Sequence, residues 1–402
     1  MAQQISSLKT GVRFKDTPIG KIPLDWEVTS LGKIAFLEYG ESLPEGKRIK
    51  GEFPVYGSNG LVGYHKKPLV KGPGIIVGRK GSVGAVTWVG NDFWPIDTTY
   101  YISKEQTKED LKWLFYLLFN INLVRLNAAT GVPGLNRDEL YSEIVPCPPH
   151  NEQRKIAENL STVDEAIEKT AQIIEKAKEV KRGLMQNLLS RGIGHRKFKK
   201  TEIGEIPAEW EAVKIKDITE KFFNGGTPDT GNKNYWGGNI PWITGADFED
   251  QKIKQIRRYT TDEGVKSSAT NVISKGNLLV VTRTGVGKIA IAPFDIAISQ
   301  DITGVILDSK KALSRYIYWY LDYKSNRLKS IIQGTSINGL LREDLESFVV
   351  PLPNLNEQKK ITKILSSINE EIEKESRHKE QLESLKKGLM QILLTGQVRV
   401  QP

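Results

Sequence analysis

Two acidic residues and a lysine form the arrangement in this sequence that could most directly carry out chemistry. Asp229 follows a proline, and Asp250 is separated from Lys252 by one residue. The pattern resembles the acidic pair and lysine that hold Mg²⁺ in many nucleases, where the metal activates a water molecule. A pattern this loose arises often by chance in a charged chain, and the first half of the chain has no clear equivalent. A self-contained, Mg²⁺-dependent nuclease is therefore an alternative hypothesis.

The signatures of other catalytic classes are missing from the sequence. It has no Asn-Pro-Pro-Tyr or Asp-Pro-Pro-Tyr box for adenine methylation, no G-x-x-x-x-G-K-[ST] loop and no G-x-G-x-x-G fingerprint. Its four histidines lack metal-ligand spacing and Cys147 is its single cysteine, so zinc and an intramolecular disulfide are not expected. We therefore expect no catalytic residue and no metal site.

Length and composition favour a multidomain protein of the cytoplasm. A chain of 402 residues is too long for one ordinary core, which predicts two to three domains. The hydrophobic content of 39% and the charged content of 26% are typical of soluble proteins. The single cysteine, the lack of a secretory signal and the lack of ~18 consecutive apolar residues predict a reducing compartment and no membrane span.

Positive charge is the main indication of a partner. The net charge of +10 suits a polyanion such as nucleic acid, although many basic proteins bind none. Arg, Lys and Asn side chains can contact base edges, and aromatic rings can pack on sugars or displaced bases. The alternative for each basic residue is a solvated surface charge. Clustered in two segments of each half, the predicted DNA contacts are Lys47, Arg48, Lys50, Lys66, Lys67, Lys233, Asn234, Tyr235, Arg257, Arg258 and Tyr259.

These clusters belong to a chain in which one pattern occurs twice. Residues 14–27 (FKDTPIGKIPLDWE) return as residues 198–211 (FKKTEIGEIPAEWE), 184 positions later. Residues 146–169 (PCPPHNEQRKIAENLSTVDEAIEK) return as residues 351–374 (PLPNLNEQKKITKILSSINEEIEK), 205 positions later. The second copy therefore carries about 21 additional residues, early in its globular part. Two long copies indicate a duplication and not a solenoid.

Each copy predicts a mixed α/β, strand-rich domain. Short apolar runs bounded by glycine, at residues 74–78 and 277–282, are typical of buried strands. The spacing of aromatic residues and leucines at residues 111–118 and 315–321 favours helices.

A long amphipathic helix is predicted behind each domain. Apolar residues at steps of three and four continue for ~38 residues, or ~57 Å at the α-helical rise. Because such a coiled-coil stripe is longer than one small domain can cover, we expect the two helices to pack on each other in antiparallel; packing on the adjacent domain is the alternative. Asn151 and Asn356 are the predicted N-caps, and Gly192 and Gly396 end the pattern.

Two glycine signals are shared by the copies. Gly183 and Gly388 interrupt both helices at one register, which suggests close helix approach or a bend. Residues 78–84 (GRKGSVG) parallel residues 282–287 (TRTGVG), and could cradle phosphate or simply form turns. Residues identical in both copies cannot supply different sequence preferences, so shared arginines should be structural or bind phosphate. The DNA contacts predicted around these segments are Arg79, Lys80, Arg283 and Lys288.

The boxes of the repeat resemble those of specificity subunits of type I restriction-modification systems. The residues that carry the resemblance are Ile19-Gly20-x-Ile22-Pro23-x-x-Trp26 and its copy at residues 203–210, residues 225–228 (GGTP), residues 236–242 (WGGNIPW), Gln300-Asp301, and the Asn-Glu-Gln boxes at residues 151–153 and 356–358. The resemblance spans essentially the whole chain and implies two target-recognition domains that each read half of a bipartite DNA sequence. The expected parts are a first target-recognition domain at 1–150, a first central helix at 151–192, a second target-recognition domain at 193–355 and a second central helix at 356–396.

The same resemblance implies partners and a non-catalytic role. Two methyltransferase (modification) subunits would bind the central helices, which act as a ruler, and motor-endonuclease (restriction) subunits would complete a complex that cleaves unmodified double-stranded DNA. No cofactor is expected on this chain, because S-adenosylmethionine, ATP and Mg would belong to the partner subunits. The other alternative is an assembly scaffold, which equal, weak affinity for all DNA sequences would support.

Overall fold

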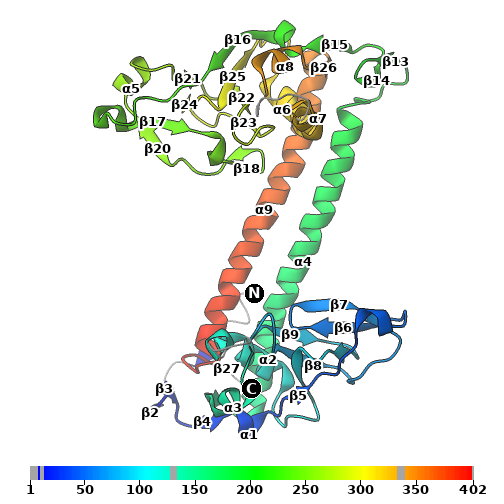
Figure 1. The fold of residues 1–402 in the computed structure, drawn as a ribbon, viewed down its shortest axis with the longest axis vertical. Coiled ribbons are helices and arrows are strands. Elements are labelled where there is room, and N and C mark those ends of the chain that lie inside the picture. Colours follow the sequence, from blue (N-terminus) through cyan, green and yellow to red (C-terminus); the bar gives the residue numbers. More distant parts are fainter. Residues whose placement is uncertain (1–7, 10–12, 127–133, 333–339, 401–402) are drawn as a thin grey trace. The chain divides into compact units, whose positions relative to one another are not determined.

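The chain folds into two units that each combine a globular part with segments of two long helices. The computed structural model describes residues 8–9, 13–126, 134–332 and 340–400. Unit 1 comprises Met1–Ala171 and Arg377–Pro402, and unit 2 comprises Gln172–Ser376. The long helices α4 (His150–Leu188) and α9 (Leu355–Leu393) contribute residues to both units (Figure 1). The division into two target-recognition domains and two central helices, which the family resemblance implies, concerns function and stays a prediction.

Unit 1 contains two small sheets. The first is antiparallel, in the order β5 (Glu38–Tyr39), β11 (Thr99–Ser103), β8 (Gly74–Gly78) and β9 (Val86–Val89). The second has the order β10 (Trp94–Pro95), β6 (Phe53–Gly57) and β7 (Gly60–His65), with β10 parallel to β6. Strand β8 is buried along its whole length, as the apolar run between glycines predicts.

A helix and the first part of α4 complete the core of unit 1. Helix α2 (Leu111–Asn120) begins where the Asp110 carboxylate accepts the backbone N–H groups of Lys112 and Trp113, which is an N-cap. Trp26 is fully buried in this core, together with side chains of β8, α2, α4 and the end of α9.

Unit 2 repeats this plan with additions. Its first sheet has the order β16 (Thr219–Asn224), β25 (Ile302–Leu307), β22 (Leu278–Val281) and β23 (Ile289–Ile291), and α6 (Ser314–Tyr323) corresponds to α2. Its second sheet has the order β20 (Arg258–Thr260), β17 (Trp236–Ile243), β24 (Ile296–Ile298) and β21 (Asn271–Ile273), in which β17 and β24 are parallel. Most of the additional residues of the second copy lie between β17 and β22, so they surround β20.

Shorter elements join these sheets to the long helices. In unit 1 they are β1 (Leu8–Lys9), β2 (Phe14–Thr17), β3 (Gly20–Pro23), β4 (Glu27–Ser30), α1 (Leu31–Ile34), η2 (Glu45–Lys47), η3 (Leu123–Leu126), α3 (Arg137–Ser142), β12 (Ile144–Cys147) and β27 (Arg399–Val400). In unit 2 they are β13 (Phe198–Thr201), β14 (Gly204–Pro207), β15 (Glu211–Lys214), η4 (Ile215–Ile218), η5 (Lys233–Tyr235), η6 (Gly245–Asp247), β18 (Phe248–Glu249), β19 (Lys252–Ile253), α5 (Asp262–Lys266), α7 (Ser325–Ile332), α8 (Arg342–Ser347) and β26 (Val349–Leu352). The pairs β2–β3 and β4–β12 correspond to β13–β14 and β15–β26.

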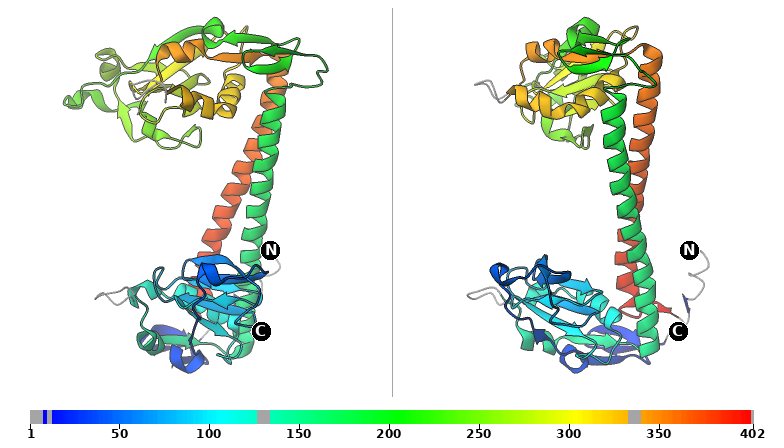
Figure 2. Two further views of the ribbon diagram at one scale, coloured as in Figure 1. Left: turned by 45° about the vertical axis from the view of Figure 1, so that its right-hand side comes forward. Right: turned by 90° about the vertical axis from the view of Figure 1, so that its right-hand side faces the viewer.

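Within each unit α4 and α9 pack side by side in antiparallel (Figure 2). In unit 1 Lys386 of α9 pairs with Asp164 of α4 at 2.6 Å. In unit 2 Lys181 of α4 donates to Asn369 of α9 at 2.7 Å. Each helix has 39 residues, close to the predicted length. Among the described residues, no helix is both long and apolar enough to cross a membrane.

Two details of the predicted helices are wrong. Asn151 and Asn356 lie inside the first turns, and the side chain that accepts a first-turn N–H of α9 is Asn354, bonded to Glu357 at 3.0 Å. Nothing lies within 4 Å of a Cβ placed at Gly183 or Gly388, so these glycines do not mark close approach of the helices.

Candidate functional site

Two of the predicted basic segments of unit 2 meet at one pocket. The carbonyl oxygen of Tyr235, at the end of η5, accepts the Thr261 N–H at 3.1 Å and the Thr260 hydroxyl at 2.7 Å, which places η5 beside β20. The pocket has a volume of about 650 Å³. It is lined by Thr230, Lys233, Trp236, Gly237, Gly238, Arg257, Arg258 and Tyr259.

Arg257 is held in place by a buried carboxylate. Its Nε donates to Asp247 at 2.6 Å and its Nη2 donates to the hydroxyl of Thr244 at 3.0 Å. The Asp247 side chain is 3% exposed. Burial raises the pKa of this carboxyl, but the hydrogen bonds from Arg257 and Thr244 outweigh burial, so the net pKa shift is downward. Asp247 therefore stays ionised and orients the guanidinium at the edge of the pocket.

The other members of the predicted set in unit 2 differ in their positions. Arg258 stacks its guanidinium over the Trp236 ring at 5.4 Å, and Tyr259 is exposed. Lys233 is exposed at the pocket. Asn234 and Tyr235 do not line it, because their carbonyl groups bind Thr261 and Thr260 to hold η5 in place.

The predicted segments of unit 1 also lie together. The backbone N–H of Ile49 donates to Nδ1 of His65 at 3.0 Å and joins the segment after η2 to the end of β7. Arg48 donates to the carbonyl oxygens of Leu43 and Val62, so its guanidinium is engaged within the unit. The cations left exposed to solvent are those of Lys47, Lys50, Lys66 and Lys67.

The glycine-rich segments match in a register different from the one predicted. The N–H of Leu135 donates to the carbonyl of Arg79 at 2.8 Å, and the N–H of the equivalent Leu340 donates to Thr282 at 2.7 Å. Arg79 therefore corresponds to Thr282, and Lys80 corresponds to Arg283. The predicted equivalence of Arg79 and Arg283 is wrong by one residue, because matching identical letters displaced the loop against its strands. The shared feature is an exposed cation, Lys80 or Arg283.

Several other candidates are engaged in structural contacts. Lys288 donates to the carbonyl oxygens of Gly245 and Phe248, at 3.1 and 2.9 Å, and so holds the turn that carries Asp247. Of the nuclease-like residues, Asp229 accepts the N–H of Gly231 in a local turn, and Lys252 pairs with Glu373. Among the residues that the structure describes, no three His, Cys, Asp or Glu side chains are grouped to hold a metal ion.

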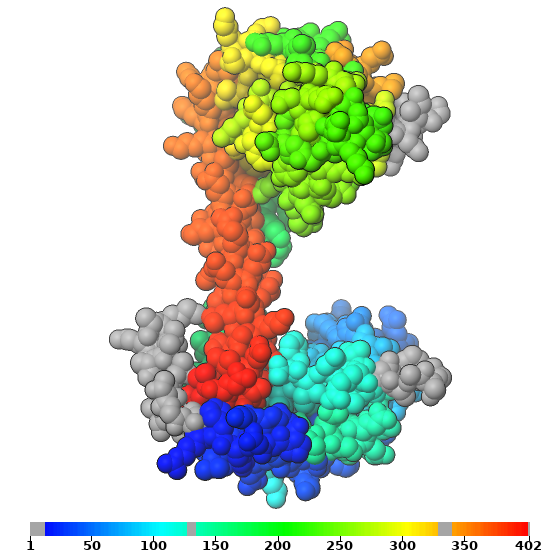
Figure 3. Space-filling model, turned by 90° about the vertical axis from the view of Figure 1, so that its left-hand side faces the viewer, coloured from blue at the N-terminus to red at the C-terminus, as the bar shows by residue number. Residues whose placement is uncertain are grey.

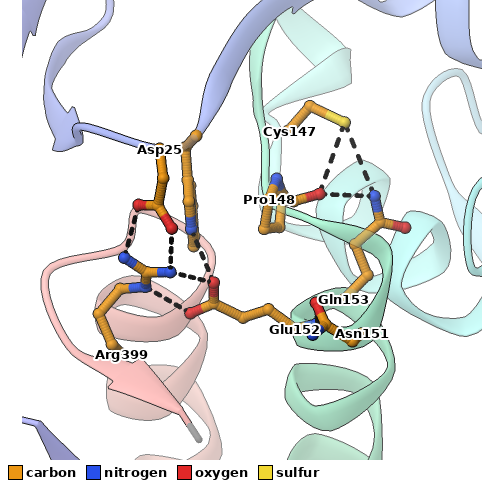
Figure 4. A network of polar contacts seen from close by, with 8 residues as sticks. Asp25, Cys147, Pro148, Asn151, Glu152, Gln153 and Arg399 are labelled. Atoms are coloured by element: carbon orange, nitrogen blue, oxygen red, sulfur yellow. Dashed lines mark hydrogen bonds and ion pairs between the residues drawn. The ribbon is translucent and has the colours of Figure 1, made fainter. Parts of the chain in front are cut away.

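A four-residue cluster fixes the start of α4 in unit 1. We call Asp25, Trp26, Glu152 and Arg399 the unit 1 anchor. Nε1 of Trp26 donates to Glu152 at 2.9 Å, and Arg399 donates twice to Glu152, at 2.6 Å each, and twice to Asp25, at 2.7 and 2.8 Å (Figure 4). The hydrogen bond from Arg399 lowers the pKa of Asp25, and the hydrogen bond to Glu152 raises the pKa of Arg399. The C-terminal segment is thereby tied to the N-terminal part of unit 1, and Figure 3 shows the two in contact.

Unit 2 has a matching cluster with a different basic residue. We call His195, Glu209, Trp210 and Glu357 the unit 2 anchor. Nε1 of Trp210 donates to Glu357 at 3.0 Å, and Nε2 of His195 lies 2.9 Å from the same carboxylate. The backbone N–H of Ile193 also donates to Glu357 at 2.9 Å, and Glu209 lies 3.7 Å from Nδ1 of His195. The position of Glu209 in the repeat corresponds to that of Asp25.

The glutamine that follows each anchor glutamate joins the long helix to the short one. Gln153 accepts the backbone N–H of Asp110, the N-cap of α2, at 2.9 Å. Gln358 accepts that of Leu313, just before α6, at 2.8 Å. Each side chain also donates to a proline carbonyl before its own helix. The Asn-Glu-Gln box is thus a joint between the globular part and the long helix within each unit.

Sequence reasoning did not assign these structural roles. Glu152 and Glu357 were noted only as parts of repeated boxes, although a glutamate retained in both copies beside a retained tryptophan was a usable signal. Asp247 lies among the additional residues of the second copy, so comparison of the copies could not single it out.

The fold and the repeated boxes define a DNA-specificity protein. The chain belongs to the family described as the type I restriction modification DNA specificity domain, whose model matches residues 23–179 and residues 207–384. The two matches correspond to the two copies of the repeat, as two-part recognition of DNA requires.

Relatives and solved structures agree with this assignment. The chain is 26% identical to the type I restriction enzyme MjaVIII specificity subunit of Methanocaldococcus jannaschii, over 96% of both chains. It is 25% identical to the EcoR124I/EcoR124II specificity subunit of Escherichia coli, over 70% of this chain and 69% of the relative. The crystal structure of a type I restriction-modification S subunit from M. genitalium has the same fold, with a TM-score of 0.68, 15% identity and coverage of 96% of this chain and 97% of that one.

Proposed function

We propose that this chain reads a bipartite DNA target, with the globular part of unit 1 reading one half and that of unit 2 the other. The observation that carries the proposal is a shared framework with different basic surfaces. Both units have corresponding sheets and the same Trp–Glu hydrogen bond, but unit 2 presents a pocket with Arg257 and Arg258, whereas unit 1 presents exposed lysines. Arginine forks and lysine ammonium groups present different hydrogen-bond donors to base edges, so the two surfaces should prefer different sequences.

The long helices are the proposed ruler and docking surface. Two methyltransferase subunits would bind α4 and α9, motor-endonuclease subunits would join them, and the helix length would set the spacer between the half-sites. The Asn-Glu-Gln joints support a ruler, because they hold each helix start rigidly on its own globular part. The chain itself would be non-catalytic, with S-adenosylmethionine, ATP and Mg on the partners and adenine as the methyl acceptor.

Mapping methylated sites in DNA from cells that express the complete system tests the proposal. Replacing Arg258 with Ala should relax one half of the methylated target and leave the other half and the spacer unchanged. Lys266→Ala removes an equal charge from an exposed position outside the pocket and is the matched control. Relaxation of both halves, or of neither, would contradict separate reading by the two units.

A second arm of the experiment tests the ruler. Seven residues, about two helical turns, would be inserted into the middle of α4 and of α9. The mapped spacer should lengthen while both half-sites stay the same. An unchanged spacer in a complex that still methylates DNA would show that the helices do not measure it.

A further inference from the structure

Two arginines of unit 1 converge on one tyrosine ring. Cζ of Arg79 and Cζ of Arg137 each lie 5.0 Å from the centroid of the Tyr39 ring. The two guanidinium groups are therefore no more than twice that distance apart. Arg79 follows β8 and Arg137 begins α3, and the hydrogen bond from Leu135 N–H to the Arg79 carbonyl keeps these segments together. The site is thus built from three segments far apart in the sequence.

Among the described residues, neither arginine has an anionic partner. No carboxylate among the described residues forms an ion pair with Arg79 or Arg137, and residues 127–133 contain no Asp or Glu. The Nε atoms of both are buried and have no hydrogen-bond acceptor. Burial raises the pKa of the adjacent Tyr100 to about 12, so its hydroxyl is neutral at physiological pH. An unsatisfied buried donor destabilises the fold, and two nearby like charges without a counter-charge repel each other.

The equivalent place in unit 2 is satisfied internally. Thr282 replaces Arg79 there, and Asn224 replaces Tyr39, because it occupies the same strand position opposite β25. Arg342 corresponds to Arg137, but its Nε donates to Glu346 at 2.6 Å. The paired, unneutralised guanidinium groups are therefore a feature of unit 1 and not a requirement of the fold.

We propose that Arg79 and Arg137 bind one phosphodiester of the DNA backbone beside the half-site of unit 1, with Tyr39 orienting both guanidinium groups. This proposal rests on the proposed function, since it names a contact of the same DNA-binding surface. A phosphodiester supplies a negative charge and two non-bridging oxygens, which can accept hydrogen bonds from both guanidinium groups. A guanine edge is neutral and would leave the two charges uncompensated. The exposed Lys80, next to Arg79, adds a third positive charge.

The test is the salt dependence of DNA binding by the full chain with its methyltransferase subunits. Affinity for a target duplex and for a scrambled duplex would be measured at several salt concentrations, for wild type, Arg79→Gln and Arg137→Gln. Each variant should bind both duplexes about tenfold less tightly, with the slope of log K against log salt reduced by about 0.9. Arg342→Gln, at the matching and internally paired position of unit 2, is the control and should leave the slope unchanged.

The outcomes separate this proposal from the function on which it rests. Folded variants with an unchanged slope, or with a loss confined to the target duplex, would overturn the phosphate contact. Equal affinity of wild type for both duplexes would instead contradict the proposed function. If the glutamine variants misfold, duplexes with single methylphosphonates along the half-site of unit 1 probe the wild-type protein directly. One position should then weaken binding about tenfold, and indifference at every position would also overturn the proposal.

Discussion

The two anchors perform the same mechanical task with different chemistry. In both, a glutamate in the first turn of a long helix accepts the indole N–H of a tryptophan from the Ile-Pro-x-x-Trp box. In unit 1 the cation beside this glutamate is Arg399, which follows α9. In unit 2 it is His195, which follows α4. Each helix start is therefore locked by residues that come after the end of the other long helix.

The two anchors show which contact is common to both copies of the repeat and which differs between them. The Trp–Glu hydrogen bond has almost the same length in both anchors, so its geometry is common to the two units. The basic residue is not kept: Arg399 carries a permanent charge and donates four hydrogen bonds to two carboxylates, whereas an imidazole has no permanent charge. The anchors should therefore respond differently to loss of the glutamate charge.

Removal of that charge is expected to have the largest effect. Glu152→Gln keeps an acceptor for Trp26 but leaves Arg399 facing a neutral amide, at a side chain that is 3% exposed. Breaking such a buried ion pair should destabilise unit 1 by about 3 kcal/mol. Glu357→Gln should cost unit 2 less, about 2 kcal/mol, because the new amide leaves the N–H of Ile193 or of Trp210 without an acceptor, but no permanently charged side chain loses its counter-charge.

Hydrogen exchange of the backbone amides of Trp26 and Trp210 measures the two effects separately. These amides donate to Pro23 and Pro207 at 3.1 and 3.0 Å, so each reports opening of its own anchor. Glu158→Gln, which removes a charge from an exposed pair on α4, is the control. Equal losses of protection in the two units would show that the cations do not distinguish the anchors.

Replacing the glycines at the ends of the long helices should destabilise the protein less, and by equal amounts in the two units. Gly192 and Gly396 have φ of +67° and +70°, which disfavours residues with a Cβ. A Cβ at Gly192 would lie 2.5 Å from Glu357, and one at Gly396 would lie 2.4 Å from Pro23. We expect each alanine variant to lose about 2 kcal/mol of stability in its own unit.

Replacing the glycines inside the long helices should have the opposite effect on stability, and these variants serve as the control. Gly183 and Gly388 are exposed and have open space around them, so alanine there should stabilise each helix by about 1 kcal/mol. Thermal unfolding and hydrogen exchange check all four variants. Stabilisation by Gly192→Ala would mean that the left-handed turn at the end of α4 is not required.

The helices and strands illustrate what the sequence could predict. Residues 74–78 were predicted as a strand and form β8, because an apolar run between glycines has few alternatives. The long helices begin within a residue or two of the predicted starts, since their apolar stripes are unambiguous. The predicted N-caps are wrong because the first turn of each helix starts earlier: Glu152 N–H bonds to the Pro149 carbonyl in α4, and Gln358 N–H bonds to the Asn354 carbonyl in α9.

The binding surface could be predicted only in part. Residues 233–235 and 257–259 were identified as basic clusters, but nothing in the sequence indicates that the pairing of β20 with β17 brings them to one pocket. The register of the glycine loops depends on hydrogen bonds to distant strands, so matching letters placed Arg283 opposite Arg79 instead of Lys80. Long-range pairing, rather than local pattern, decides these positions.

The binding surfaces of the two units should also differ when a supporting residue is removed. Asp247→Asn removes the charge that orients Arg257 in unit 2, and should reduce affinity for the target duplex about tenfold while leaving a scrambled duplex almost unaffected. In unit 1 the fork of Arg48 is held by carbonyl oxygens, which no single side-chain change removes. Asp262→Asn, an exposed aspartate of α5, is the control. An equal loss on both duplexes would indicate that Arg257 binds phosphate and not a base.

Acid should produce the smallest effect, through Asp25 of the unit 1 anchor. The pKa of Asp25 is lowered in the folded protein by the hydrogen bond from Arg399, with burial opposing this shift. A carboxyl whose folded pKa lies below its unfolded pKa stabilises the fold at pH values above the unfolded pKa, about 3.9. This contribution is lost as the pH falls through the folded pKa.

The protection of the Trp26 amide should therefore decline below about pH 4 in wild type. Asp25→Asn should lack this part of the decline and already be slightly less protected at neutral pH. Because Asp25 is more than half exposed, its contribution is that of a surface pair. If wild type and Asp25→Asn lose protection of the Trp26 amide in parallel, the Asp25 carboxylate does not hold Arg399. The unit 1 anchor then depends on Glu152 alone.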